Sequence, residues 1–398
     1  MSDLELCYLP ATEAIERFKA KTLSPVELLE ALIKRSEEVD PVINAFTYRH
    51  FDEAMANAKK AEAKYASGKR TRALEGLPIG IKDENFIKGK PTSSGSLIMK
   101  DFVADTTSVG NERILRAGGI VHARTATPEF SSAGYTHSRL WGVTRNPWNP
   151  EFTPGGSSGG SAASLAAGTS AIATGSDIGG SIRIPAGTCG LVGYKPPYGR
   201  NSDDPPFNLD FYCHTGPLAR NVSDAILLQN VMCGPHPKDM ASLRPKLRLP
   251  GHYPPIRDWK IAFSMDLGFF EVDPDVQKNT LKALDVFRDL GATVEEVEIG
   301  WDHRALDAGI AYLSHIFGAY MATYLADHAD KMTSYVRQWA KEAQKSTSAD
   351  FLQTLEVANE MYATVGPLLE KYQVLVCPTT ALPAVPADFD HSTDVLSI

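Results

Sequence analysis

The chain has 398 residues, with 40 basic and 48 acidic side chains and a net charge of −8. Apolar residues make up 43% of it, which excludes an intrinsically disordered chain, since such chains bury too little apolar surface to offset the entropy of ordering. The acidic balance argues against a nucleic-acid-binding protein, because phosphate contacts need a basic face. We therefore expect a globular protein with a sizeable core.

Targeting and metal signals are missing from the sequence. None of the five cysteines stands in a C-x-x-C pair, so neither a zinc ribbon nor a disulfide framework is indicated. The first ten residues, MSDLELCYLP, lack the basic and apolar regions of a signal peptide. No apolar run reaches the roughly 18 residues of a membrane-spanning helix. The sequence predicts a cytoplasmic protein without a metal or a membrane partner.

Two helices are predicted near the N-terminus. Ser24 is a suitable N-cap, Pro25 suits the first helical position and Glu27 completes a capping box. An apolar stripe follows and ends near Pro41. Residues 52–67 are rich in Ala, Lys and Glu and predict a second, more exposed helix.

An alternation of strands and helices follows. Residues 77–81 form a short apolar run, typical of a buried strand, that ends at Lys82. A helix over 108–117 stops at two glycines, and a strand begins at Ile120. Such β-α-β alternation predicts an α/β sheet. Residues 155–200 are dense in small residues, with a short helix expected over 161–167 and a strand over 171–173.

The second half begins after six prolines between residues 235 and 256, which predict a long extended connection over the surface. Beyond it we expect further elements at the following positions: a strand over 260–263, an amphipathic helix over 274–290, a half-buried strand over 293–299, helices up to about 371 and a buried strand over 374–376.

The serine-rich stretches 155–161 (GGSSGGS) and 175–183 (GSDIGGSIR) contain the candidate catalytic residues. A serine hydroxyl is a poor nucleophile until a base accepts its proton. Acyl transfer also needs donors at the position where an oxyanion develops. The backbone N–H groups just before Ser181 belong to residues without bulky side chains at 179 and 180, and such a loop can bind an anion.

A base for this serine is less obvious. None of the ten histidines stands in a pattern that singles it out. Lys82, at the end of a buried strand, could serve if burial lowers its pKa. The alternative is that Lys82 forms a structural ion pair with Asp83 or Glu84.

Three motifs in order resemble those of the amidase signature family: GLPIGIKD at 76–83, GGSSGGS at 155–161 and GSDIGGSIRIPAGTCG at 175–190. The resemblance runs from about residue 10 to the end. It implies an amidase with a Ser–cis-Ser–Lys triad and no cofactor. Matched by motif, Ser181 is the nucleophile, Ser157 is the bridging serine with the cis peptide bond, and Lys82 is the base.

The resemblance also assigns surrounding residues. In this interpretation Lys82 takes a proton from Ser157, which takes one from Ser181, and Ser157 later protonates the leaving amine. The residues expected around this relay are the oxyanion-hole amides of Ile178, Gly179, Gly180 and Ser181, with Ser158 and Asp177 beside them, and Arg183 behind Asp177. Arg183 could equally be a plain ion pair of Asp177.

The fold that the resemblance implies is α/β, with a large twisted mixed sheet flanked by helices on both faces. We expect one domain over 1–398 with four regions: 1–74 helical, 75–234 with the triad, 235–256 as the Pro-rich connection, and 257–398 as a second α/β region. Family members continue for several dozen residues beyond Cys377, so the usual C-terminal end is expected to be missing here.

Three other interpretations are open. The sequence GGSSG at 155–159 fits the nucleophile elbow of α/β-hydrolases, but residues 145–150 before it are a poor strand. A non-catalytic binding module would have lost a triad residue, and all three are present. The main alternative is the glutamine-hydrolysing chain of an amidotransferase, which works with partner chains on misacylated tRNA, although residues 197–207 depart from that subfamily's pattern.

The expected substrate is a small or aryl carboxamide. The stretches 130–141 and 207–214 contain several aromatic residues, which suit an apolar or aryl acyl group, although these side chains could also be ordinary core residues. The products would be a carboxylate and ammonia or an amine. Neither nucleic acid nor a membrane is an expected partner, and a homodimer is left open.

Overall fold

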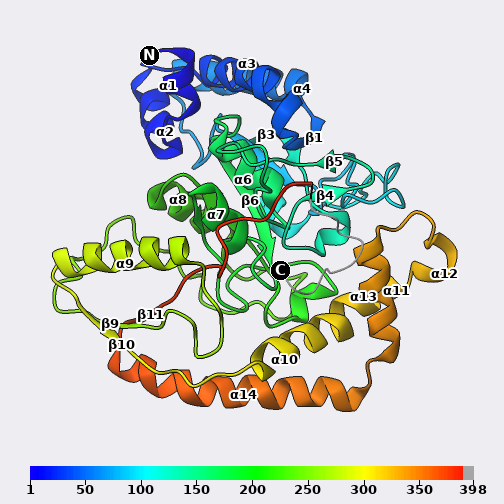
Figure 1. Ribbon diagram of the computed structural model, residues 1–398. Coiled ribbons are helices and arrows are strands. Elements are labelled where there is room, and N and C mark those ends of the chain that lie inside the picture. The colour runs from blue at the N-terminus through cyan, green and yellow to red at the C-terminus, as the bar shows by residue number, and fades with distance from the viewer. Residues whose placement is uncertain (389–398) are drawn as a thin grey trace. The chain divides into compact units, whose positions relative to one another are not determined.

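The computed structural model describes residues 1–388 (Figure 1). These residues form two compact units. Unit 1 contains Met1–Gly251, Lys331–Thr333 and the described part of the segment that begins at Ala384. Unit 2 contains His252–Asp330 and Ser334–Pro383. The change at residue 251 falls within the Pro-rich stretch 235–256. The last ten residues of the region predicted over 257–398 lie outside the described part.

Unit 1 is built on a six-stranded mixed sheet with the order β1-β3-β2-β6-β8-β7. Its strands are β1 (Phe46–Arg49), β2 (Pro78–Lys82), β3 (Ile120–Thr125), β6 (Ile172–Asp177), β7 (Val192–Gly193) and β8 (His214–Ala219). Strand β2 lies parallel to both β3 and β6, whereas the β1–β3, β6–β8 and β7–β8 pairs are antiparallel. The predicted α/β class with a large mixed sheet is confirmed.

The helices of unit 1 are α1 (Asp3–Cys7), α2 (Ala11–Ala20), α3 (Pro25–Ile43), α4 (Phe51–Ala66), α5 (Val109–Arg116), α6 (Gly159–Ala166), α7 (Arg183–Cys189) and α8 (Val222–Met232). Short pieces complete the unit: the 3₁₀ turns η1 (Glu129–Ser131) and η2 (Phe207–Leu209), and the β4–β5 hairpin (His137–Ser138 and Gly142–Val143). The capping box predicted at Ser24 and Glu27 is present. Helix α3 ends at Ile43, two residues beyond Pro41 and close to the predicted end, since a proline lacks the helical N–H donor and clashes with the carbonyl four residues before it.

Helices cover both faces of this sheet. Successive residues of a strand point to opposite faces, and the core clusters follow that rule. Ile172 belongs to the cluster formed with α1, α2, α3 and α8, whereas its neighbour Ala173 belongs to the cluster formed with α6 and α7. Every residue of β2 is buried, so the residues at the end of this strand lie in the interior of the unit.

Glu75, just before β2, gives unit 1 a pH-dependent stability. Its carboxylate is 4% exposed and accepts hydrogen bonds from Arg72 and Lys64. Burial alone would raise the pKa of Glu75, but these bonds outweigh it and lower the pKa from 4.5 to about 2. A lowered carboxyl pKa stabilises the fold above the unfolded value, and this contribution is lost as the pH falls. The difference in unfolding free energy between wild type and Glu75→Gln should therefore shrink from pH 5 to pH 2 in denaturant titrations; a constant difference would contradict this.

Unit 2 contains a three-stranded parallel sheet with the order β10-β9-β11. Its elements are β9 (Lys260–Phe263), α9 (Pro274–Asp289), β10 (Thr293–Glu296), α10 (Arg304–Leu313), the π-helical η3 (Ser314–Gly318), α11 (Ala319–Ala322), α12 (Leu325–His328), α13 (Ser334–Lys345), α14 (Ser348–Lys371) and β11 (Val374–Val376). Their order along the chain matches the predicted order.

The edge strands of unit 2 differ from the prediction in burial. β11 was expected to be buried and is half-buried, while β10 ends at Glu296 and is mostly exposed. Among the described strands of this sheet, β9 is the one with a neighbour on each edge, and its last three residues are buried.

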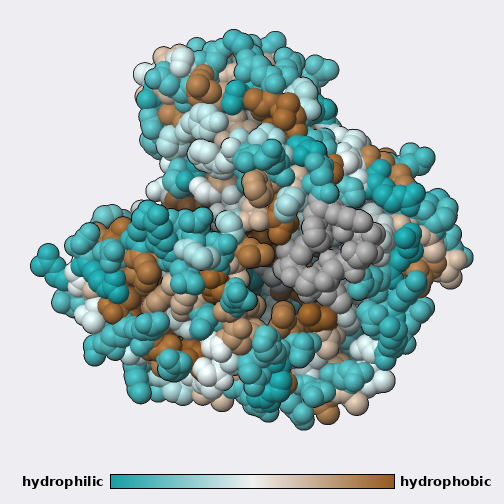
Figure 2. All heavy atoms as spheres, viewed as in Figure 1, coloured by the Kyte–Doolittle hydropathy of each residue, from teal (hydrophilic) through white to brown (hydrophobic). Residues whose placement is uncertain are grey.

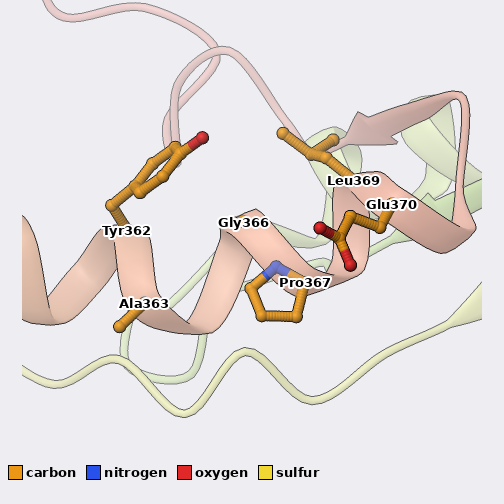
Figure 3. Close-up of a pocket in the computed structure, with 6 residues that line it drawn as sticks. All are labelled: Tyr362, Ala363, Gly366, Pro367, Leu369 and Glu370. Atoms are coloured by element: carbon orange, nitrogen blue, oxygen red, sulfur yellow. The ribbon is translucent and has the colours of Figure 1, made fainter.

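Apolar side chains also reach the surface of unit 2. Figure 2 shows hydrophobic residues over α9, where Leu281, Val286 and Leu290 are exposed. A shallow hollow lies along α14 and is lined by Tyr362, Ala363, Gly366, Pro367, Leu369 and Glu370 (Figure 3). Within residues 1–388, no helix is both long and apolar enough to cross a membrane.

Candidate active site

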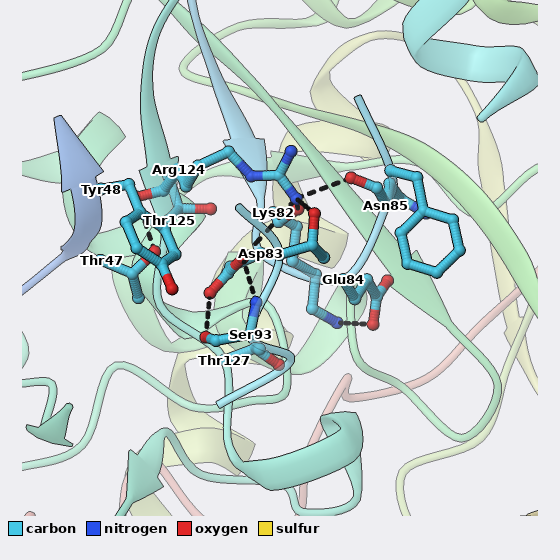
Figure 4. A network of polar contacts seen from close by, with 12 residues as sticks. Thr47, Tyr48, Lys82, Asp83, Glu84, Asn85, Ser93, Arg124, Thr125 and Thr127 are labelled. Atoms are coloured by element: carbon cyan, nitrogen blue, oxygen red, sulfur yellow. Dashed lines mark hydrogen bonds and ion pairs between the residues drawn. The ribbon is translucent and has the colours of Figure 1, made fainter. Parts of the chain in front are cut away.

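The buried lysine at the end of β2 is the centre of the site (Figure 4). The Lys82 side chain has no exposed surface. Its Nζ donates to Ser157 Oγ at 2.7 Å and to Ser176 Oγ at 2.9 Å, and it lies 3.2 Å from Glu84 Oε2. The two interpretations of Lys82 are therefore compatible, because it contacts both a serine of the Gly/Ser motif and a neighbouring carboxylate.

Ser157 stands in the loop before α6, and its peptide bond with Gly156 is cis. The loop is held against the backbone of Tyr135: a Cβ added at Gly156 would lie within 2.6 Å of Tyr135 C and N. Only glycine fits there, so the glycine directly before Ser157 is a packing requirement of this turn. The resemblance expects a cis bond at this position. Residues 145–155, directly before this loop, contain no strand, whereas a nucleophile elbow follows directly on one.

Ser158 connects this loop to the second serine motif. Its hydroxyl exchanges hydrogen bonds with the Ser176 backbone, accepting from N at 3.3 Å and donating to O at 3.4 Å. Its own N–H donates to the Ser181 carbonyl at 3.2 Å. The structure thus brings the Ser181 backbone into contact with Ser158, the residue that follows Ser157. Ser181 is half-buried, and its hydroxyl forms no hydrogen bond with residues 1–388.

Asp177 organises the turn between β6 and α7. Its carboxylate is fully buried and accepts from the amides of Gly180 at 2.8 Å and Ile182 at 3.1 Å. Arg183 forks onto the same carboxylate with Nε at 2.9 Å and Nη2 at 2.8 Å. Burial alone would raise the pKa of Asp177, but the Arg183 guanidinium and these bonds outweigh it and lower the pKa. The ion pair expected between Arg183 and Asp177 is present.

The backbone amides of this turn differ from one another. The Gly180 N–H is directed to Asp177, so this amide already has an acceptor. Those of Ile178, Gly179 and Ser181 find no acceptor among residues 1–388. Unsatisfied amides in one turn form a cradle for an anion.

The electrostatics of Lys82 combine two opposing effects. Burial is the larger and lowers the pKa of Lys82, while the Glu84 carboxylate opposes it. Ser131 donates a hydrogen bond to Glu84. Lys82 is therefore more easily deprotonated than an ordinary lysine.

Asp83 points away from Lys82 and into a separate buried network with Arg124, Ser93 and Tyr48 nearby (Figure 4). Asp83 Oδ1 lies 3.6 Å from Arg124 Nη2, and both side chains are fully buried. Ser93 donates its amide to Asp83 Oδ1 at 3.1 Å and its hydroxyl to Oδ2. Burial raises the pKa of Asp83 to about 6. This pair anchors the chain directly after Lys82.

Asp83→Ala should destabilise the protein by about 3–5 kcal/mol, because it leaves the Arg124 charge buried without a counter-ion. Urea unfolding at pH 8, where Asp83 is ionised, measures the change. Glu13→Ala, which removes an exposed pair with Arg17, should cost no more than about 0.5 kcal/mol. Equal effects of the two substitutions would contradict the assignment of the buried pair.

Three residues around Lys82 had no predicted role: Ser176, Ser131 and Cys213. Ser176 lies on β6, next to β2, and the carboxyl ends of parallel neighbours meet at one edge. That rule could have indicated it from the sequence. Cys213 lies close enough to act electrostatically on Lys82, and burial raises the pKa of its thiol well above the usual value.

Comparison with known proteins decides the family. The Amidase family model matches residues 27–397. The chain belongs to the amidase signature family. It is an amidase-family hydrolase, as the three sequence motifs implied.

Similar amidase signature proteins include both hydrolases and amidotransferase chains. An acylamidase from Rhodococcus erythropolis is 32% identical over 97% of this chain and 82% of its own length. A glutamyl-tRNA(Gln) amidotransferase subunit from Carboxydothermus hydrogenoformans is 37% identical over 74% of this chain and 62% of its own. A solved bacterial aryl acylamidase matches with a TM-score of 0.89 and 30% identity, covering 96% of this chain and 82% of that one.

No candidate metal site accompanies this site in residues 1–388. In the part of the chain that the structure describes, no three His, Cys, Asp or Glu side chains are grouped so that they could hold a metal ion.

Proposed function

We propose that this amidase signature protein hydrolyses the C–N bond of a small carboxamide with an aryl or other apolar group. Ser181 is the nucleophile, Ser157 the proton relay and Lys82 the base. The observation that carries this proposal is the 2.7 Å hydrogen bond between Lys82 Nζ and Ser157 Oγ, made by a lysine that has no exposed surface.

The relay begins with a neutral Lys82. Lys82 takes the proton of Ser157, Ser157 takes that of Ser181, and Ser181 Oγ forms a bond to the amide carbonyl carbon. Ser157 then passes its proton to the leaving nitrogen as the C–N bond breaks and regains one from Lys82, which becomes neutral again. Water, deprotonated by the same relay, attacks the acyl-enzyme and releases the carboxylate. The lowered pKa of Lys82 supports the first step.

The oxyanion of the tetrahedral intermediate needs donors in place before the reaction. The amides of Ile178, Gly179 and Ser181 have no other acceptor among the described residues, which supports their role. Gly180 is a weaker candidate than its neighbours, because its N–H already binds Asp177 at 2.8 Å. Asp177 and Arg183 hold the shape of the turn in this proposal, and Ser158 joins it to Ser157.

Aromatic side chains in the loop before β8 support an aryl or apolar substrate. Phe211 is 61% exposed and lies 4.7 Å, between ring centroids, from Tyr198. Tyr212 is also exposed and directly precedes Cys213, which acts electrostatically on Lys82. An apolar group bound against these rings would bury surface that is otherwise in water. Relatives named as acylamidase and aryl acylamidase agree with this substrate class.

The test is the reaction of the isolated chain with a fluorophosphonate, followed by intact mass spectrometry and an amide panel. A single adduct, together with release of aniline from acyl anilides, is the expected result. A folded protein that takes up no adduct and hydrolyses no free amide would overturn the proposal.

A second candidate is the glutamine-hydrolysing chain of a tRNA-dependent amidotransferase. The amidotransferase relatives at 37% identity favour it. Such a chain would be nearly silent on anilides alone and would release ammonia from glutamine only with partner chains and aminoacyl-tRNA. Anilide hydrolysis by the isolated chain therefore separates the two functions.

A further inference from the structure

Glu84 is a carboxylate in the site to which the relay gives no role. It stands two residues after Lys82, and its side chain is 17% exposed. Its Oε2 lies 3.2 Å from Lys82 Nζ (Figure 4). The same oxygen also accepts the hydroxyl of Ser131. The carboxylate therefore touches the same nitrogen that touches Ser157.

The Ser131 hydroxyl is held in place for this contact. Phe130 and Ser131 both adopt left-handed backbone conformations, with φ of 51° and 57°. Such a backbone conformation is strained in a non-glycine residue and persists only where its surroundings fix it. The hydroxyl also lies 2.9 Å from Thr127 Oγ1. Glu84 thus keeps a hydrogen-bond donor that does not depend on the charge of Lys82.

Without Glu84, the site would lack a negative charge in direct contact with Lys82. When Lys82 takes a proton, an ammonium appears on a side chain with no contact to water, and an isolated buried charge is costly. The other charged or titratable groups facing Lys82 and Glu84 are Arg124 from β3, Asp177 from β6 and Cys213 before β8. Among the described residues, Glu84 is the one carboxylate in ion-pair contact with Lys82.

We propose that Glu84 is a positioning residue of the amidase: its carboxylate orients the Lys82 amine toward Ser157 and balances the charge that Lys82 gains from the relay. This inference rests on the proposed function of Lys82. The role is comparable to that of a carboxylate that orients a catalytic histidine and stabilises its charged form.

The proposal fixes the sign of a pH effect. A carboxylate beside an ammonium favours the protonated form, so the pKa of Lys82 is higher with Glu84 than without it. Glu84→Gln removes the charge and keeps the side-chain length. Lys82 should then lose its proton at a lower pH, and the acidic limb of activity should move in the same direction.

The experiment measures the rate at which a fluorophosphonate labels Ser181 between pH 5 and 10. In Glu84→Gln the midpoint of the acidic limb should fall by about one to three pH units relative to wild type, the range expected when a neighbouring opposite charge is removed. In Glu84→Asp, which keeps the charge on a shorter chain, the midpoint should lie between the two. The second variant keeps the test valid if Glu84→Gln does not fold.

The matched control is Glu112→Gln, since Glu112 is 23% exposed and pairs with Arg116 on α5. Its acidic limb should coincide with that of wild type. The proposal would be overturned if the midpoint of the acidic limb stayed in place or moved to higher pH in the Glu84 variants, even if their labelling rates fell. A purely structural role would lower the rates without moving this midpoint. A wild type with no Ser181 adduct at any pH would instead overturn the proposed function, and this inference with it.

Discussion

Ser181→Ala should abolish the fluorophosphonate adduct and lower amide hydrolysis by about 10⁴-fold or more. The substitution removes the oxygen that forms the acyl-enzyme, and loss of a serine nucleophile leaves only binding and oxyanion stabilisation. The hydroxyl of Ser181 makes no hydrogen bond with the described residues, so its removal should not unfold the protein. Initial rates on an acyl anilide and intact mass after labelling measure both effects.

A buried serine elsewhere in unit 1 provides the control. Ser202 is 2% exposed and donates to the Gly234 carbonyl at 2.9 Å, so Ser202→Ala should cost about 1 kcal/mol of stability and retain the activity. An adduct of unchanged mass on the Ser181 variant would place the nucleophile elsewhere and contradict the assignment made by motif.

Much of the fold is predictable from local signals in the sequence. The capping box at Ser24 fixes the start of α3, and the apolar run before Lys82 predicts β2 within one residue. Burial in unit 2 is harder to predict: residues 374–376 are as apolar as a central strand, but β11 lies at a sheet edge. Position in a sheet depends on long-range pairing, which a local pattern does not contain.

The site is predictable in part, for a similar reason. The motifs single out Lys82, Ser157 and Ser181, but they leave open whether Asp83 or Glu84 pairs with the lysine. The structure pairs Glu84 with it and Asp83 with Arg124. Glu84 lies in the turn that follows β2, where the alternation of a strand no longer holds, so the pairing depends on the geometry of that turn.

The contribution of Ser131 is a second feature that the motifs do not contain. Its hydroxyl reaches Glu84 because two consecutive residues adopt left-handed conformations. Nothing in the residue types Phe-Ser predicts this, since such conformations favour glycine, asparagine and aspartate. They depend on the packing of η1, which is a tertiary effect.

Lys82→Met should lower amide hydrolysis at pH 8 by about 10²–10⁴-fold, the usual contribution of a general base. Methionine keeps most of the side-chain length in the buried site but cannot accept the proton of Ser157. In wild type, activity should rise with pH as Lys82 loses its proton, with a midpoint below 10.5 because burial lowers the pKa of this lysine. In Lys82→Met this limb should disappear. Rates from pH 5 to 10, with circular dichroism to confirm folding, test both expectations.

Lys64→Met is the control for this change, because Lys64 forms its ion pair with Glu75 at the opposite end of β2. It should affect stability while the wild-type pH profile of activity is retained. A folded Lys82→Met variant with full activity would exclude the lysine as base. A variant with low activity and an unchanged acidic limb would assign that limb to another group, and Lys82 would then act in the site only by holding Ser157 through the 2.7 Å hydrogen bond.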